Sequence, residues 1–270
     1  MDLFVRESGP VEAPAIVFLH GGIMSGWSWD PVVARLQHYR CLVPDLPQYG
    51  KSFEHGPFDM ANAAMAIAAL IRSRAGEGRA HIVGFSLGAQ VAVQLLATQP
   101  DLVDRAVLSG TFINMLPGVS VTRRVVGILA RTAWFRWLVI NRHWHRHDVP
   151  LPMGQGYLED ARLNAGAELA HIVEASAGFT LPARLGESHS ASLFLSGSEE
   201  NILVRRWATL LAASMPNGVD MVATGVRHDW PHRHPELFAR TVDSWLSQTP
   251  LPSEIRIPSP GSLSRSRDLG

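Results

Sequence analysis

The sequence predicts an α/β fold, in which a mostly parallel β-sheet has helices on both faces and a helical cap insertion. Apolar runs typical of buried strands alternate with helical segments along most of the chain. Residues 114–187 contain no good strand and interrupt this alternation. With 270 residues, 46% of them hydrophobic, the chain is long enough to bury a large core.

The expected strands are short and almost continuously apolar, because helices cover a parallel sheet on both sides. A glycine, proline or polar residue closes each run and marks the turn into the next segment. In chain order they are an edge strand in "LFVRES", then "AIVFLHGG" (Ala15–Gly22), "RCLVPDLP", "AHIVGFS", "RAVLSG", "ASLFLSG" and the strand-like "VDMVAT".

Helical spacing of apolar residues fills the segments between these strands. Asp30–Gln37 starts with an N-cap type of residue followed by proline. Met60–Arg74 is rich in alanine, which favours helix. The remaining core helices are expected at Leu87–Thr98, Ile202–Met215 and Pro235–Leu246.

The alternation divides the chain into three parts. Residues 1–113 and 188–247 are expected to form the α/β core. Residues 114–187 are expected to form a helical cap over one edge of the sheet, with helices at Val121–Trp144 and Leu163–Ala177. Residues 248–270 are rich in proline, serine and arginine without apolar periodicity, so a disordered tail is expected there.

The charge balance and the cysteine content indicate which partners and which cellular compartment are expected. Lys plus Arg and Asp plus Glu are equal at 24 each, which favours neither nucleic acid nor an anionic membrane as a partner. Cys41 is the only cysteine, so no internal disulfide forms and a reducing, cytoplasmic compartment is expected. The acidic residue at position 2 argues against a signal peptide, and no apolar window of about 18 residues predicts a membrane span.

The stretch "AHIVGFSLGAQ" (Ala80–Gln90) joins a predicted strand directly to a predicted helix. Its centre, Gly84–Phe85–Ser86–Leu87–Gly88, fits a nucleophile elbow, a sharp turn that exposes a serine hydroxyl at its tip. The neighbours two residues to either side are crowded in such a turn, which favours glycine. Ser86 is therefore the predicted nucleophile, and it needs a base and an acid elsewhere in the chain.

Candidates for both follow in chain order. A carboxylate pair, Glu199 and Glu200, comes just after the strand "ASLFLSG". His228 lies in "GVRHDWPHRHPELF", in a loop between "VDMVAT" and the last helix. Serine, acidic residue and histidine in this order are typical of one large group of hydrolases.

These motifs together resemble the α/β-hydrolase superfamily, and the resemblance covers residues 1 to about 247. His20–Gly21–Gly22 resembles the oxyanion loop of that superfamily. "PDLPQYGKS" (Pro44–Ser52) resembles its Pro-Asp-x-Pro-Gly-x-Gly-x-Ser loop, with Gln48 in place of the first loop glycine. "GVRHDWPHRHPELF" resembles its Gly-x-x-His segment. Many members carry the acid in a Gly-x-x-Asp segment, and the matching position after Gly197 is Glu200.

The resemblance implies a role for each residue. Ser86 attacks a carbonyl and becomes acylated, His228 moves the proton, and Glu200 stabilises the imidazolium. Backbone N–H groups of Gly22 and Leu87 form the oxyanion hole, or Ile23 replaces Gly22 if the loop takes another register. No metal and no organic cofactor is implied.

Neighbouring residues leave alternatives open. Glu199 competes with Glu200 for the role of acid, and the family register favours Glu200. His232 and His234 lie in the same loop as His228, and both are interpreted as surface histidines.

Aromatic and histidine-rich segments suggest further candidates. Trp27 is expected to line the pocket or to serve in packing. Trp134 and Trp137 of the cap are candidate substrate-binding residues, in a stripe of which most is expected to be cap core and part to face the acyl group. "NRHWHRHD" brings together His143, His145 and His147, but a helix end is the favoured interpretation over zinc.

The sequence therefore predicts a cytoplasmic serine hydrolase that cleaves a small-molecule carboxylic ester or lactone. Hydrolysis of a carbon–carbon bond in a diketone-like substrate is the first alternative, and a slow-turnover binding protein is the second. Epoxide hydrolase and dehalogenase chemistry is disfavoured, because those members have Asp where Ser86 stands. The oligomeric state is left open.

Overall fold

The computed structural model describes residues 2–114, 154–163 and 169–258 of the chain. It also describes a few single positions between the first two ranges, namely residues 125, 128, 129, 132, 134 and 138. The expected histidine cluster at residues 143–147 and the position of Trp137 lie outside the described residues.

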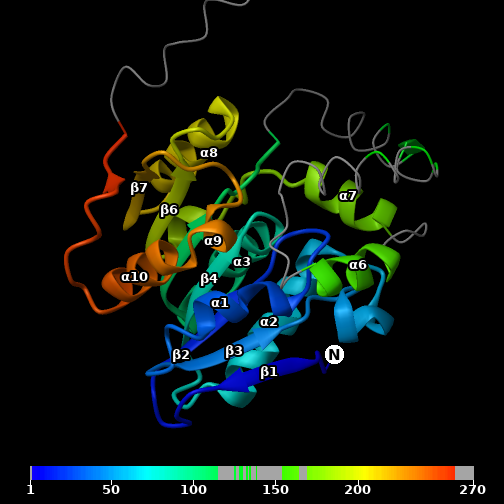
Figure 1. Cartoon of the computed structure of the whole chain (residues 1–270), viewed down its shortest axis with the longest axis horizontal. Helices are drawn as coiled ribbons and strands as arrows, with labels where there is room; N and C mark the ends of the chain where they lie inside the picture. Colours follow the sequence, from blue (N-terminus) through cyan, green and yellow to red (C-terminus); the bar gives the residue numbers. More distant parts are fainter. Residues whose placement is uncertain are drawn as a thin grey trace, which may run out of the picture.

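The described strands form a single eight-stranded sheet in the order β1-β3-β2-β4-β5-β6-β7-β8 (Figure 1). The six inner strands are parallel, and β1 and β8 pair antiparallel to them at the two edges. The strands are β1 (Val5–Ser8), β2 (Ala15–Leu19), β3 (Arg40–Pro44), β4 (Ala80–Phe85), β5 (Val103–Ser109), β6 (Ala191–Gly197), β7 (Gly218–Ala223) and β8 (Ile255–Arg256). The predicted α/β fold with a mostly parallel sheet is confirmed.

Helices connect the strands and occupy much of the insertion that the structure describes. The α-helices are α1 (Asp30–Val33), α2 (Met60–Arg74), α3 (Leu87–Thr98), α6 (Gly154–Leu163), α7 (Leu169–Ala177), α8 (Ile202–Ala213), α9 (Trp230–Arg233) and α10 (Pro235–Leu246). Short 3-10 helices lie at Gly26–Trp29, Gly50–His55, Pro100–Leu102 and Leu185–Glu187. In the part of the chain that is described, no helix is long and apolar enough to cross a membrane.

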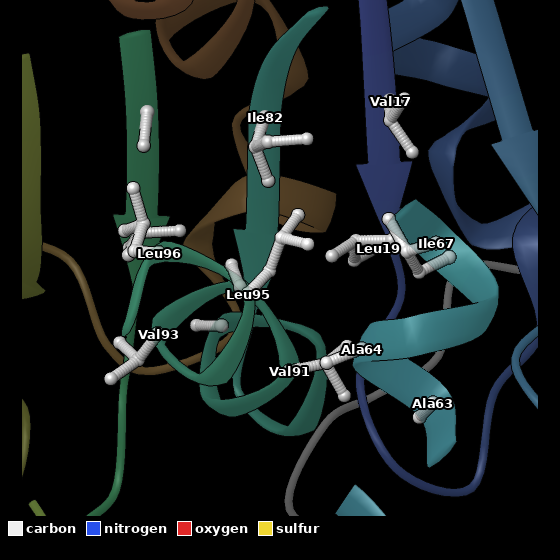
Figure 2. Packing of buried hydrophobic residues seen from close by; sticks show 14 of the residues in the cluster. Val17, Leu19, Ala63, Ala64, Ile67, Ile82, Val91, Val93, Leu95 and Leu96 are labelled. Carbon is white, nitrogen blue, oxygen red and sulfur yellow. The ribbon is translucent and has the colours of Figure 1, made fainter. Parts of the chain in front are cut away.

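Alternation along the strands divides the core into two layers. Val17 and Leu19 of β2 belong to the layer with α2, α3 and α8, whereas Ile16 and Phe18 belong to the layer with α1, α9 and α10. Figure 2 shows the first layer, in which side chains of β2 and β4 meet those of α2 and α3. Burying one such aliphatic side chain contributes about 1.5–3 kcal/mol, so the sheet is a rigid base for whatever its loops carry.

Several elements differ from the sequence-based expectation: α1 ends at Val33 and not at Gln37, α7 begins at Leu169 and not at Leu163, and α9 was not expected. Helix α6 was not expected, because Gly154 and Gly156 lower the helix propensity of its first turn. The expected disordered tail from residue 248 is wrong for its first part, since β8 pairs with β7 and buries Ile255. Two residues are too few to show apolar periodicity in the sequence.

Candidate active site

Ser86 lies between the last residue of β4 and the first residue of α3. Its backbone has φ 51° and ψ −111°, a strained conformation for a residue with a side chain. Hydrogen bonds hold this turn on both sides: Ser86 N donates to Ser109 O at 2.9 Å, and Gln90 N donates to Ser86 O at 3.1 Å. The strain is therefore fixed by the sheet and by the first turn of the helix.

Glycine is required on both sides of Ser86 because other backbone comes too close. A Cβ atom at Gly84 would lie 2.8 Å from Ala89 Cα, and one at Gly88 would overlap the carbonyl oxygen of Leu19. The sequence predicted crowding between the two glycines themselves. The structure confirms this crowding for Gly84, where a Cβ would also lie 2.9 Å from Gly88 O, and shows that Gly88 is crowded in addition by the end of β2.

The predicted oxyanion loop follows β2 and is held by His20. Leu46 N donates to His20 Nε2 at 3.0 Å, so the ring proton is on Nδ1, which donates to Gly21 O at 2.8 Å. His20 is fully buried, and this burial lowers its pKa and keeps the ring neutral. The histidine thus fixes the loop that leads to Gly22 and Ile23.

Glu200 and His228 form a hydrogen-bonded pair at the ends of β6 and β7. His228 Nδ1 donates to Glu200 Oε1, and Gly197 N donates to the other carboxylate oxygen at 2.9 Å. The Glu200 side chain is only 3% exposed, whereas that of His228 is 32% exposed. A buried carboxylate with two donors is a rigid partner for an imidazole that remains accessible.

Two further residues shape the position of the His228 ring. Gly110 has φ 65° at the end of β5, and a Cβ atom there would lie 2.5 Å from His228 Cε1. The ring of Phe85 packs against the imidazole in a tilted arrangement, with a centroid distance of 4.9 Å. Neither role was predicted, although Phe85 stands inside the elbow motif.

Glu199 points away from this pair. Its side chain is 53% exposed, and its Oε2 lies 3.3 Å from Arg227 Nε. The structure therefore brings Glu200, and not its neighbour, to His228.

A cavity of about 430 Å³ brings the predicted residues together. Ser86, Leu87, Gly22 and His228 lie on the side of the sheet, and Leu169, Ile172 and Val173 of α7 lie opposite. No charged side chain is among the described residues that line it. The apolar wall from α7 was not assigned from the sequence, but the i, i+3, i+4 spacing of its residues is a visible signal.

The tryptophans expected near the substrate lie elsewhere or outside the described residues. Trp27 does not line this cavity and instead anchors α6. Its Nε1 donates to Asp160 Oδ2 at 2.6 Å, and its indole lies so close to Gly156 that a Cβ there would come within 2.8 Å. Trp134 is 66% exposed.

The structure contradicts the interpretation of His232. It was interpreted as a surface histidine, but it is only 8% exposed, and its Nδ1 donates to Ser28 O at 3.2 Å. Its ring meets Phe85 edge-on at 5.0 Å, and Phe85 also contacts the imidazole of His228. His234 is exposed, as expected.

A family model of the alpha/beta hydrolase fold matches residues 14–143, which include the loop after β2 and the elbow. The chain belongs to the α/β-hydrolase superfamily. An AB hydrolase superfamily protein of Gibberella zeae is 29% identical, covering 94% of this chain and 87% of the relative.

Two further comparisons extend over most of the chain. Pimeloyl-[acyl-carrier protein] methyl ester esterase of Yersinia pseudotuberculosis is 25% identical, covering 84% of this chain and 91% of the relative. The structure of an esterase from Exiguobacterium antarcticum superposes with a TM-score of 0.74 at 18% identity, covering 91% and 95% of the two chains. This last similarity supports the fold.

The attachment of α6 to Trp27 predicts a pH dependence of stability. Burial raises the pKa of Asp160 to about 6, with the nearby charge of Asp45 adding to the rise and hydrogen bonds from Trp27 and Ser25 opposing it. An acid with a raised pKa stabilises the fold fully below its unfolded pKa near 4, and this contribution is lost as the pH rises through about 6. Asp160→Asn keeps an acceptor for Trp27 and removes this loss, which is on the order of 3 kcal/mol at most.

Urea unfolding of both proteins between pH 4.5 and 7.5 measures the effect. The stability of Asp160→Asn relative to the wild type should rise with pH across this range. Glu159→Gln removes an exposed carboxylate from the same helix and serves as the control. Parallel pH curves for Asp160→Asn and the wild type would contradict the assignment.

Proposed function

We propose that this protein is a serine hydrolase that cleaves carboxylic esters or lactones through an acyl-enzyme intermediate. One observation carries the proposal: the strained Ser86 and the Glu200-paired His228 open into the same uncharged cavity. A serine hydroxyl needs such a base to act as a nucleophile, and an elbow of this kind frees it from the surrounding backbone.

The reaction begins with Ser86 Oγ, which attacks the ester carbonyl while His228 Nε2 accepts its proton. The negative oxygen of the tetrahedral intermediate accepts hydrogen bonds from the N–H groups of Gly22 and Leu87. Each such donor typically lowers the barrier by about 3–4 kcal/mol. His228 then gives the proton to the leaving alcohol, and the acyl group stays on Ser86. Glu200 stabilises the imidazolium throughout.

Water completes the cycle. His228 removes a proton from a water molecule, which attacks the acyl carbonyl, and the proton returns to Ser86 as the carboxylic acid leaves. These steps need neither a metal ion nor an organic cofactor. The proton of the Ser86 hydroxyl passes through His228 to the alcohol, and one proton of the water passes through His228 back to Ser86.

The cavity favours an uncharged, apolar acyl group. Leu169, Ile172 and Val173 line the same cavity as Ser86, and a carboxylate buried against them would lack a partner. The relative from Yersinia, named for a methyl ester substrate, supports the ester bond as the target. Its percentage identity and coverage support the reaction class, and the acyl group here is inferred from the cavity.

Ser86→Ala should abolish ester turnover while thermal unfolding stays close to that of the wild type, because the hydroxyl is small and lies at the tip of a turn. A p-nitrophenyl phosphonate should modify the wild type at Ser86, as peptide mass spectrometry would show, and should leave the variant unmodified. Modification of a different serine, or full turnover by Ser86→Ala, would refute the assignment.

A panel of substrates separates this proposal from the alternatives. Purified protein is offered short and medium p-nitrophenyl esters, lactones and diketones. Fast turnover of the esters or lactones supports the proposal, preference for diketones favours carbon–carbon bond hydrolysis, and stoichiometric binding without turnover favours a receptor.

Glu200→Gln should lower kcat by about 10³–10⁴-fold, because a neutral amide cannot stabilise the imidazolium and favours the wrong ring tautomer. Glu199→Gln is the matched control, since it changes the adjacent carboxylate, which faces Arg227. Its kcat should stay within about twofold of the wild type. A larger loss for Glu199→Gln than for Glu200→Gln would reverse the assignment of the acid.

A further inference from the structure

Gln90 is a polar side chain buried completely, one turn along α3 from Ser86. Its own backbone N–H donates to the carbonyl of Ser86. A buried amide needs partners for its two N–H groups and its oxygen, and an unsatisfied one costs about 1–3 kcal/mol. The hydrogen-bond partners of the Gln90 side chain therefore show which segments this residue joins.

Within the described residues, the side chain of Gln90 bonds to the two ends of the insertion. Gln90 Nε2 donates to Phe112 O at 2.8 Å and to Ser176 O at 3.1 Å. Ser176 Oγ donates to Gln90 Oε1 at 2.8 Å. Phe112 follows β5, where the chain leaves the sheet, and Ser176 lies in the last turn of α7, where the chain returns.

Asn114 joins these two ends directly. Its backbone N–H donates to Phe179 O at 2.7 Å, and its side chain donates to Ala177 O at 2.8 Å. The outgoing and returning segments are thus tied to each other by Asn114, and both are tied to α3 by Gln90.

The same two segments form a wall of the cavity. Phe112 and Ser176 line it together with Ile172 and Val173 of α7. Gln90 lies in the first turn of the helix that follows Ser86, so its three side-chain hydrogen bonds join the start of this helix to the wall.

We propose that Gln90 is a positioning residue that sets the depth of the acyl cavity by joining the helix of Ser86 to both ends of the insertion. This inference rests on the proposed hydrolase function. If Gln90 has this role, selectivity for the length of the acyl chain depends on an amide side chain that does not itself line the cavity. A short acyl group stays near Ser86 and the oxyanion donors, whereas a longer one reaches the wall that Gln90 holds.

Gln90→Met tests this inference, because methionine is similar in length but makes none of the three hydrogen bonds. Two p-nitrophenyl phosphonates, one with a methyl and one with an octyl group, report on Ser86 without requiring turnover. The rate of modification by the methyl compound should stay within about threefold of the wild type. The rate with the octyl compound should fall at least about tenfold, because the wall moves relative to Ser86.

Gln94→Met is the control. Gln94 lies one turn further along α3, is partly exposed and does not line this cavity, so its variant should keep the wild-type ratio of the two rates. Ser176→Ala removes the bond to Gln90 Oε1 together with a hydroxyl of the cavity lining, and it should change the ratio in the same direction by a smaller factor. In the double variant, the effect of Ser176→Ala should largely disappear if it acts through Gln90.

The outcomes are distinct. A folded Gln90→Met protein with the wild-type ratio, or with equal losses for both phosphonates, overturns the positioning role. If Gln90→Met does not fold, an unchanged ratio in Ser176→Ala overturns it instead. Failure of both phosphonates to modify wild-type Ser86 overturns the proposed function itself.

Discussion

The strained backbone of Ser86 is the constraint on which the rest of the site depends. A residue with φ 51° persists here because β5 and α3 hydrogen-bond to both of its peptide groups, and because Gly84 and Gly88 leave room for the neighbouring backbone. Strain of this kind is stable only when the surroundings determine it. The two packed layers of the sheet supply that rigidity, so the core and the proposed chemistry are linked through one turn.

The other site residues depend on the parallel arrangement of the strands. The carboxyl ends of β2, β4, β5, β6 and β7 meet at one edge, where they bring the loop after β2, Ser86, Gly110, Glu200 and His228 together. The insertion adds the apolar side of the cavity from α7. Gln90 and Trp27 attach this insertion at two separate places, the first close to Ser86 and the second at α6.

Local patterns predicted the sheet, the core helices and the proposed triad positions, because an apolar run or an elbow motif depends on neighbours in the sequence. Contacts between segments that lie far apart in the sequence were not predicted. Helix α6 has a poor propensity at Gly156, but that glycine fits against Trp27, which lies far away in the chain. Gln48 replaces a glycine of the related loop at φ 68°, and its side chain compensates by accepting a hydrogen bond from Phe58 N at 2.6 Å. The burial of His232 likewise depends on Phe85 and Ser28.

The most direct test of the central claim is whether two esters of one acid pass through the same acyl group on Ser86. p-Nitrophenyl and phenyl esters of a medium-chain acid are hydrolysed by the wild type in the presence of methanol, and the methyl ester and free acid are quantified. A common acyl-enzyme predicts the same product ratio for both esters, because water and methanol then compete for one intermediate. A ratio that changes with the leaving group would contradict the acyl-enzyme and with it the proposed role of the strained serine.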